Sequence, residues 1–313
     1  YEIISRLSVK GYRQKWLATD KDNYQKVTIE TLHDDLINDK TAIENIRYEL
    51  QVSQTLSHPL FPKCIDTFLH NERLYLVWEN YDHESLISAF NNGVFSSASD
   101  KQIMDLLFKI GNGLHYAHLL NIFHGRLNGE NIILDPNLDP KLINFSINHS
   151  LDSTDPGSGT VFSSKNLTAP ELFTGNDRNA LSDFYALGII GNMLLNIHSK
   201  TATSISKSLR STRPDIDAAT TLILDGLTSE DLLIRKEYIS RFLDNSFLDP
   251  HKTPVNGVDI IQISKREKRR LDRMNKRPAR IRVIPLLIKT AIIVTLGVVA
   301  CLVVLLLAPQ YFN

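Results

Sequence analysis

The chain contains very little cysteine, with only Cys64 and Cys301 among its 313 residues. Two such distant cysteines, without a C-x-x-C pair, exclude a disulfide framework and a cysteine-based zinc site, and they are typical of a reducing compartment. The sequence also lacks net charge, because 35 Lys and Arg balance 35 Asp and Glu. Since a basic excess is concentrated in residues 265–282, the rest of the chain is acidic and offers no broad basic surface, so we expect no nucleic-acid partner. It opens at Tyr1 without a signal-peptide pattern and has no Met before Met104, so we expect further sequence upstream.

The positive charge is concentrated near the end of the chain. Residues 265–282, KREKRRLDRMNKRPARIR, hold ten Lys or Arg and two acids. Residues 290–308 follow with 19 uncharged positions, which span roughly 28 Å as a helix and match a bilayer core. We therefore expect a transmembrane helix over 283–308 and a short tail over 309–313, with a buried core helix as the alternative. Since the basic residues precede the helix, this predicts a single-pass membrane protein with residues 1–282 cytoplasmic and the basic segment on anionic lipid.

Ahead of that segment the patterns change from strands to helices. Strand patterns occur at 1–5, 15–20, 26–31 and 74–79, with one amphipathic helix at 40–57. Apolar stripes then predict long helices at 103–117, 182–196 and within 215–248. A strand-rich front and a helix-rich back predict an α+β protein with two unequal lobes, 1–80 and 81–250. The turn residues of HKTPVNG mark 251–282 as a linker and basic juxtamembrane segment.

Several short motifs, in a fixed order along the chain, carry a more specific signal. NIFHGRLNGENIILD at 121–135 resembles the catalytic loop H-R-D-L-K-P-x-N of protein kinases. YELQVSQTLSHPLF at 48–61 resembles their regulatory helix and the His-Pro turn after it. TAPE at 168–171 resembles the A-P-E that ends the activation segment, and SDFYALG at 182–188 resembles the helix of a buried Asp. Up to about residue 248 the chain is therefore similar to the eukaryotic-type (Hanks-type) Ser/Thr protein kinase family, and its layout resembles bacterial membrane-anchored kinases.

The resemblance implies a two-lobed protein-kinase-like fold, with a β-rich N-terminal lobe (N-lobe), a helical C-terminal lobe (C-lobe) and one C-terminal transmembrane helix. It implies structural roles for Glu49 in the regulatory helix, His124 and Phe145 beneath the active site, Glu171 paired with Arg235, Asp183 as a helix anchor, and Trp78 as the gatekeeper that closes the back pocket. The loop before Glu171 is rich in Ser and Thr. It is either a solvated loop or a set of phosphate acceptors: Ser153, Thr154, Thr160 and Ser164.

Four residues differ from the family pattern at positions that take part in phosphoryl transfer. Glu30 stands at the strand lysine that holds nucleotide phosphates, and at about 4 Å its carboxylate would repel Glu49 by roughly 4 kcal/mol. Arg126 stands at the catalytic aspartate, and a guanidinium with a pKa above about 12 cannot accept a proton. Asn128 replaces the neighbouring lysine, and Asn144 replaces the metal-binding aspartate with a weaker amide ligand. We therefore expect no catalytic residue and no metal site.

The glycine-rich loop of the family is lost as well. Its three glycine positions hold Ser8, Lys10 and Arg13. Side chains at these positions should block the close approach of backbone amides to phosphates. Lys15 falls above the adenine position and argues against a purine pocket. Of the two usual metal ligands, only Asn131 is kept.

Two main classes of function follow from these observations. The first is a catalytically inactive, membrane-anchored pseudokinase without a cofactor. It would act as a signalling scaffold or allosteric regulator of a kinase, a phosphatase, a phosphoprotein or a missing N-terminal domain. The alternative is an atypical ATP-dependent Ser/Thr protein kinase, in which Lys10, Arg13 and Asn131 would help to bind ATP and Mg²⁺. A purely structural membrane anchor is a third class, but it does not explain a whole two-lobed domain.

Overall fold

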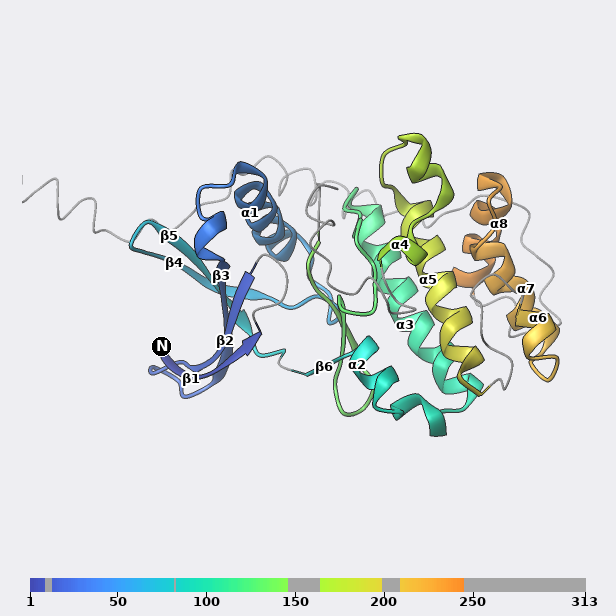
Figure 1. Ribbon diagram of the computed structural model, residues 1–313, viewed down its shortest axis with the longest axis horizontal. Helices are drawn as coiled ribbons and strands as arrows, with labels where there is room; N and C mark the ends of the chain where they lie inside the picture. The colour runs from blue at the N-terminus through green and yellow to red at the C-terminus, as the bar shows by residue number, and fades with distance from the viewer. Residues whose placement is uncertain (9–12, 82, 146–163, 199–208, 245–313) are drawn as a thin grey trace, which may run out of the picture.

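The computed structural model describes residues 1–8, 13–81, 83–145, 164–198 and 209–244. They form two unequal lobes: a twisted sheet with one long helix packed on it, and a larger bundle of helices (Figure 1). The expected α+β architecture, with a β-rich N-lobe and a helical C-lobe, is confirmed.

The N-lobe is built on an antiparallel five-stranded sheet in the order β1-β2-β3-β5-β4. The strands are β1 (Glu2–Ser8), β2 (Arg13–Thr19), β3 (Lys26–Leu32), β4 (Cys64–His70) and β5 (Arg73–Glu79). The central strand β3 is buried over residues 27–32, as its β-branched residues predict. The register of β2 and β3 places Lys15 opposite Glu30, so the two side chains lie on the same face of the sheet.

Helix α1 (Lys40–Thr55), the regulatory helix of the sequence analysis, lies against this sheet (Figure 1). It follows a short 3-10 helix, η1 (Asp34–Leu36), and begins where the Asp39 carboxylate accepts a hydrogen bond from the backbone of Ala42 at 2.7 Å. Ile46 and Leu50, on the predicted apolar face, pack with residues of β3 and β5 in one buried cluster. The same helix face carries Glu49 toward the sheet.

The C-lobe consists of helices and one small sheet. The helices are α2 (Leu86–Asn91), η2 (Val94–Ser97), α3 (Asp100–Leu119), α4 (Ser164–Leu167), η4 (Pro170–Thr174), α5 (Ala180–Leu195), η5 (Asn196–His198), α6 (Leu209–Thr212), α7 (Ala218–Leu227) and α8 (Leu232–Leu243). The sheet pairs β6 (Glu84–Ser85), β7 (Ile132–Leu134) and β8 (Pro140–Leu142). Both long helices, α3 and α5, begin with a capping box, which makes their starting residues well defined.

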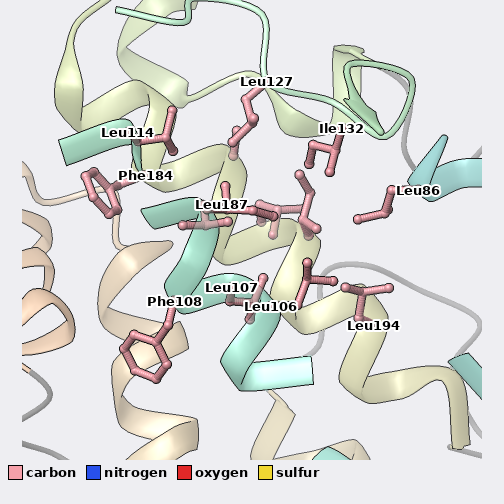
Figure 2. Packing of buried hydrophobic residues seen from close by; sticks show 14 of the residues in the cluster. Leu86, Leu106, Leu107, Phe108, Leu114, Leu127, Ile132, Phe184, Leu187 and Leu194 are labelled. Atoms are coloured by element: carbon pink, nitrogen blue, oxygen red, sulfur yellow. The ribbon is translucent and has the colours of Figure 1, made fainter. Parts of the chain in front are cut away.

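The core of the C-lobe lies between α3 and α5. Leu107 from α3 and Leu187 and Leu194 from α5 meet there (Figure 2), and all three are fully buried. Gly191 allows the close approach, because a Cβ there would lie 2.7 Å from the Leu107 side chain and 2.9 Å from that of Leu224 on α7. Each fully buried Leu contributes about 1.5–3 kcal/mol, so this core is a rigid support for the loops above it.

Within the ranges given above, no helix is both long enough and apolar enough to cross a membrane. The expected transmembrane helix over 283–308, the tail and the basic segment 265–282 all lie outside the described residues. The membrane location therefore stays a prediction.

Candidate functional site

A group of charged and polar side chains fills the space between the sheet, α1 and the connection to the C-lobe. We call it the Arg13 cluster; its members are Arg13 and Lys15 on β2, Glu30 on β3, Glu49 on α1, and Tyr81 just after β5. Four of them are more than nine-tenths buried, at 3% exposure for Arg13, 1% for Glu30, 4% for Glu49 and 6% for Tyr81. Charges buried this deeply need partners of opposite sign.

The Arg13 guanidinium supplies that partner to both carboxylates. Its Nη1 lies 2.8 Å from Glu30 Oε2 and 2.5 Å from Glu49 Oε2. The expectation that Glu49 would be repelled from β3 is therefore wrong, because a cation from the glycine-loop position stands between the two acids. In place of a strand lysine paired with a helix glutamate, this chain has two glutamates joined by one arginine.

Two further groups bind the other oxygen of Glu30. Lys15 Nζ lies 2.7 Å from Glu30 Oε1, and the Tyr81 hydroxyl donates a hydrogen bond to the same atom. Burial disfavours a charge on Glu30, but Lys15 and Arg13 outweigh it and lower the pKa of this carboxyl to about 2. Glu30 is therefore ionised at neutral pH.

The carboxylate of Glu49 is less well stabilised than that of Glu30. Burial raises the pKa of Glu49, and the nearby Arg13 offsets that effect only in part. Its Oε1 has no hydrogen-bond partner among the described residues. The two acids of the cluster thus differ in how strongly their charge is stabilised.

The hollow that remains beside the cluster is small. Its lining includes Glu49, Trp78 and Asn144, and its volume is about 30 Å³, which holds about two water molecules. Trp78, at the gatekeeper position, is 6% exposed and packs edge-on against Tyr81 with ring centroids 6.5 Å apart. This cavity by itself is too small for a purine nucleotide.

The loop of residues 124–131 is held by its own amide side chains. Asn128 Oδ1 accepts hydrogen bonds from the backbone N–H groups of Glu130 and Asn131, both at 3.0 Å. Asn131 Nδ2 donates to the Arg126 carbonyl at 2.8 Å. Its Oδ1 accepts from Asn144 Nδ2 at 2.7 Å. The two amides at the family's metal positions therefore bind each other, and Asn131 would have to exchange this hydrogen bond for a Mg²⁺ ion in order to coordinate one.

The described residues hold no group of three or more His, Cys, Asp and Glu that could bind a metal ion. Asn144 has a φ of +62°, a left-handed conformation that Asn tolerates better than most residues. The backbone therefore turns so that its side-chain amide reaches Asn131.

Beneath that loop lies a buried aromatic pair. The His124 ring centroid is 4.5 Å from that of Phe145, and His124 Nδ1 accepts a hydrogen bond from the Arg126 backbone at 3.2 Å. Burial lowers the pKa of His124 to about 4, so the ring is neutral at pH 7. The Asp183 carboxylate anchors the loop by accepting from the backbone N–H groups of His124 (2.8 Å) and Gly125 (2.9 Å).

A second buried ion pair ties the C-lobe together. Arg235 Nη1 on α8 lies 2.6 Å from Glu171 Oε1 on η4, and the Arg235 side chain is fully buried. The guanidinium also donates to the Ser229 carbonyl, at 2.9 and 2.7 Å, and lies over the Tyr185 ring. The two residues that the resemblance paired do lie in contact.

The remaining site predictions lie at the margins of what the structure describes. Lys10, Ser153, Thr154 and Thr160 fall outside the described residues, and Ser164 begins α4. The sequence analysis missed Tyr81 and the bridging role of Arg13. One signal could have found Arg13: two acids at facing positions of β3 and α1 need a cation between them.

The N-lobe is a five-stranded sheet carrying one helix, the C-lobe is helical, and a buried aspartate anchors the loop at 124–131. Together these features define a protein kinase fold. A family model described as "Protein kinase domain" matches residues 12–236. The chain belongs to the protein kinase domain family.

The curated relatives match this chain over only part of their own length. The Ser/Thr protein kinase PknA of Mycobacterium tuberculosis is 27% identical over 197 residues, which cover 61% of this chain and 45% of PknA. The Ser/Thr protein kinase PrkC of Bacillus subtilis is 28% identical over 192 residues, covering 61% of this chain and 29% of PrkC. Among solved structures, the kinase domain of M. tuberculosis PknI matches with a TM-score of 0.57 and 18% identity, over 78% of this chain and 93% of that one. The chain thus matches less than half the length of PknA and of PrkC, and the PknI likeness concerns the fold alone.

Proposed function

We propose that this chain is a catalytically inactive pseudokinase that acts as a scaffold or allosteric regulator of a protein partner. The observation that carries the proposal is the Arg13 cluster. Kinases hold nucleotide phosphates with a strand lysine and backbone amides. Here the same place contains the buried carboxylates of Glu30 and Glu49, with Arg13, Lys15 and Tyr81 packed around them.

The other requirements of phosphoryl transfer point the same way. The reaction needs a group that accepts the substrate hydroxyl's proton and metal ions that neutralise the phosphates. Arg126 cannot accept a proton. Asn144 Nδ2 donates a hydrogen bond to Asn131 Oδ1 at 2.7 Å, so the amides of these two residues bind each other. The base, the phosphate lysine and one of the two metal ligands are replaced, so no single compensation would restore the reaction.

The proposed partner is a kinase, a phosphatase or a phosphoprotein, or a domain joined to the N-terminal side. We further propose that the domain is tethered to a membrane by one helix over 283–308, with residues 1–282 cytoplasmic. The support is the uncharged run at 290–308 and the ten basic residues that precede it. A tethered domain meets other proteins of the same membrane surface at a high effective concentration.

The test is a thermal-shift assay of the full chain with about millimolar ATP, with and without Mg²⁺. A ligand at 100 times its dissociation constant adds about 2.7 kcal/mol to the free energy of unfolding, which is several degrees for a domain of this size. We expect no shift under either condition. A Mg²⁺-dependent shift would instead support the alternative, an atypical ATP-dependent Ser/Thr kinase, which the kinase relatives and the retained Asn131 favour.

A double variant separates the two functions further. Glu30→Lys with Arg126→Asp returns two family residues to their usual positions. An unconventional enzyme should lose activity, since its own groups have been replaced. A pseudokinase should remain inactive or gain weak nucleotide binding.

A further inference from the structure

Glu30 and Glu49 share one guanidinium nitrogen, but they are not equally stabilised. Glu30 is contacted by Arg13 at 2.8 Å, by Lys15 at 2.7 Å and by the Tyr81 hydroxyl. Glu49 forms an ion pair with Arg13 at 2.5 Å. Its second oxygen is buried and has no hydrogen-bond partner among the described residues. The cluster therefore supports a full negative charge on Glu30 much better than on Glu49.

The two carboxylates also lie close together, so the ionisation of one affects the ionisation of the other. Glu30 Oε2 and Glu49 Oε2 both contact Arg13 Nη1, so they are no farther apart than those two contacts, 2.8 and 2.5 Å, placed end to end. Two carboxylates this close resist ionising together, and the less stabilised one keeps its proton to higher pH. Burial raises the pKa of Glu49 above its ordinary 4.5, in agreement with the geometry.

Glu49 also lies where its charge can affect how α1 docks on the sheet. It sits on α1, whose apolar contacts to the sheet come from Ile46 and Leu50, and it is the residue through which α1 reaches the Arg13 cluster. The charged and titratable groups that face it are Arg13 and Lys15 from β2, Glu30 from β3 and Tyr81 from the connection after β5. A neutral Glu49 keeps its hydrogen bond to Arg13 without the cost of burying a second charge.

We propose that Glu49 and Arg13 form a proton-sensitive latch that holds α1 on the sheet while Glu49 is protonated and loosens when Glu49 ionises. The direction of the pH effect follows from the surroundings of Glu49. When α1 is docked, Glu49 is desolvated beside Glu30; when α1 is undocked, Glu49 is in water. Ionisation of Glu49 therefore favours the undocked helix. The latch goes beyond the proposed function, because it sets the position of α1 whether or not the domain transfers phosphate.

The test is hydrogen–deuterium exchange of the full chain between about pH 4.5 and 8.5, corrected for intrinsic exchange rates, with α1 and α5 followed separately. Below its ordinary pKa of 4.5, Glu49 should contribute its full stabilisation of the docked helix. As pH rises toward the raised pKa, the opening equilibrium of α1 should increase by up to about tenfold per pH unit and then level off. Exchange in α5 should not follow that curve.

Two variants make the result specific. Glu49→Gln keeps the acceptor for Arg13 but cannot ionise, so its α1 exchange should lose the pH dependence. Glu44→Gln removes an exposed acid from the same helix and should behave as wild type. The proposal is overturned if wild type and Glu49→Gln give the same profile. It is also overturned, on the wild-type data alone, if α1 and α5 respond to pH together or α1 does not respond. Neither outcome depends on ATP, so the proposed function is tested separately.

Discussion

Replacing Arg13 with Met removes the cation that two buried acids share. Arg13, Glu30 and Glu49 are each less than 5% exposed, so little solvent screens the loss. Breaking a buried ion pair by removing one partner costs about 3–5 kcal/mol. For a domain of roughly 200 residues, each kcal/mol lowers the melting temperature by about 2–4 °C. Arg13→Met should therefore melt about 10 °C below wild type.

The assay is thermal unfolding of the full chain at pH 7, followed by circular dichroism. Arg6→Met is the matched control, because Arg6 on β1 is exposed and its guanidinium donates a hydrogen bond to the exposed Gln14 side chain at 3.3 Å. This variant should change stability by less than about 0.5 kcal/mol. Adding Glu49→Gln to Arg13→Met removes the carboxylate that loses its ion pair with Arg13, while Glu30 keeps Lys15, so the double variant should regain part of the loss. An Arg13→Met protein that melts within about 1 °C of wild type would refute the bridging role, as would a double variant no more stable than the single one.

Three further outcomes are expected. Glu171→Ala leaves the fully buried Arg235 without its carboxylate and should cost about 3–5 kcal/mol in urea unfolding; a loss below about 1 kcal/mol would contradict it. His124 has a pKa lowered to about 4, so stability should fall as pH drops from about 6.5 toward 4, by roughly 2–3 kcal/mol from this group. His124→Phe should show a smaller acid loss in the same assay, and an equal loss would show that other groups cause it. Asn144→Asp returns a metal carboxylate but leaves Arg13 in place, so isothermal titration with ATP and Mg²⁺ should still detect no binding; a measurable affinity would mean that the metal ligand alone was limiting.

Much of the fold was predictable because it rests on local periodicity. The alternating pattern around β3 and the apolar stripe of α3 require no knowledge of distant contacts. The contact between Glu171 and Arg235 was predictable for another reason: Glu171 stands in the TAPE motif, and Arg235 is placed like the arginine that pairs with that glutamate in the kinase family.

The Arg13 cluster was not predictable in the same way. From the sequence, Glu30 and Glu49 were compared as an isolated pair, and Arg13 was weighed only for its effect on phosphate binding. The direction of the Arg13 side chain depends on its burial among β2, β3 and α1, and no local sequence pattern predicts it. Tyr81 was missed for the same reason, since its inward direction depends on the carboxylate it meets.

The Arg13 cluster also has an evolutionary consequence. Its members depend on one another's charge, so a single change to lysine at position 30 would place three cations beside Glu49 alone. Residues of the cluster would therefore have to change together to keep the buried charges paired. The cluster thus constrains which sequences the domain can reach by one substitution at a time, because its stability depends on several residues at once.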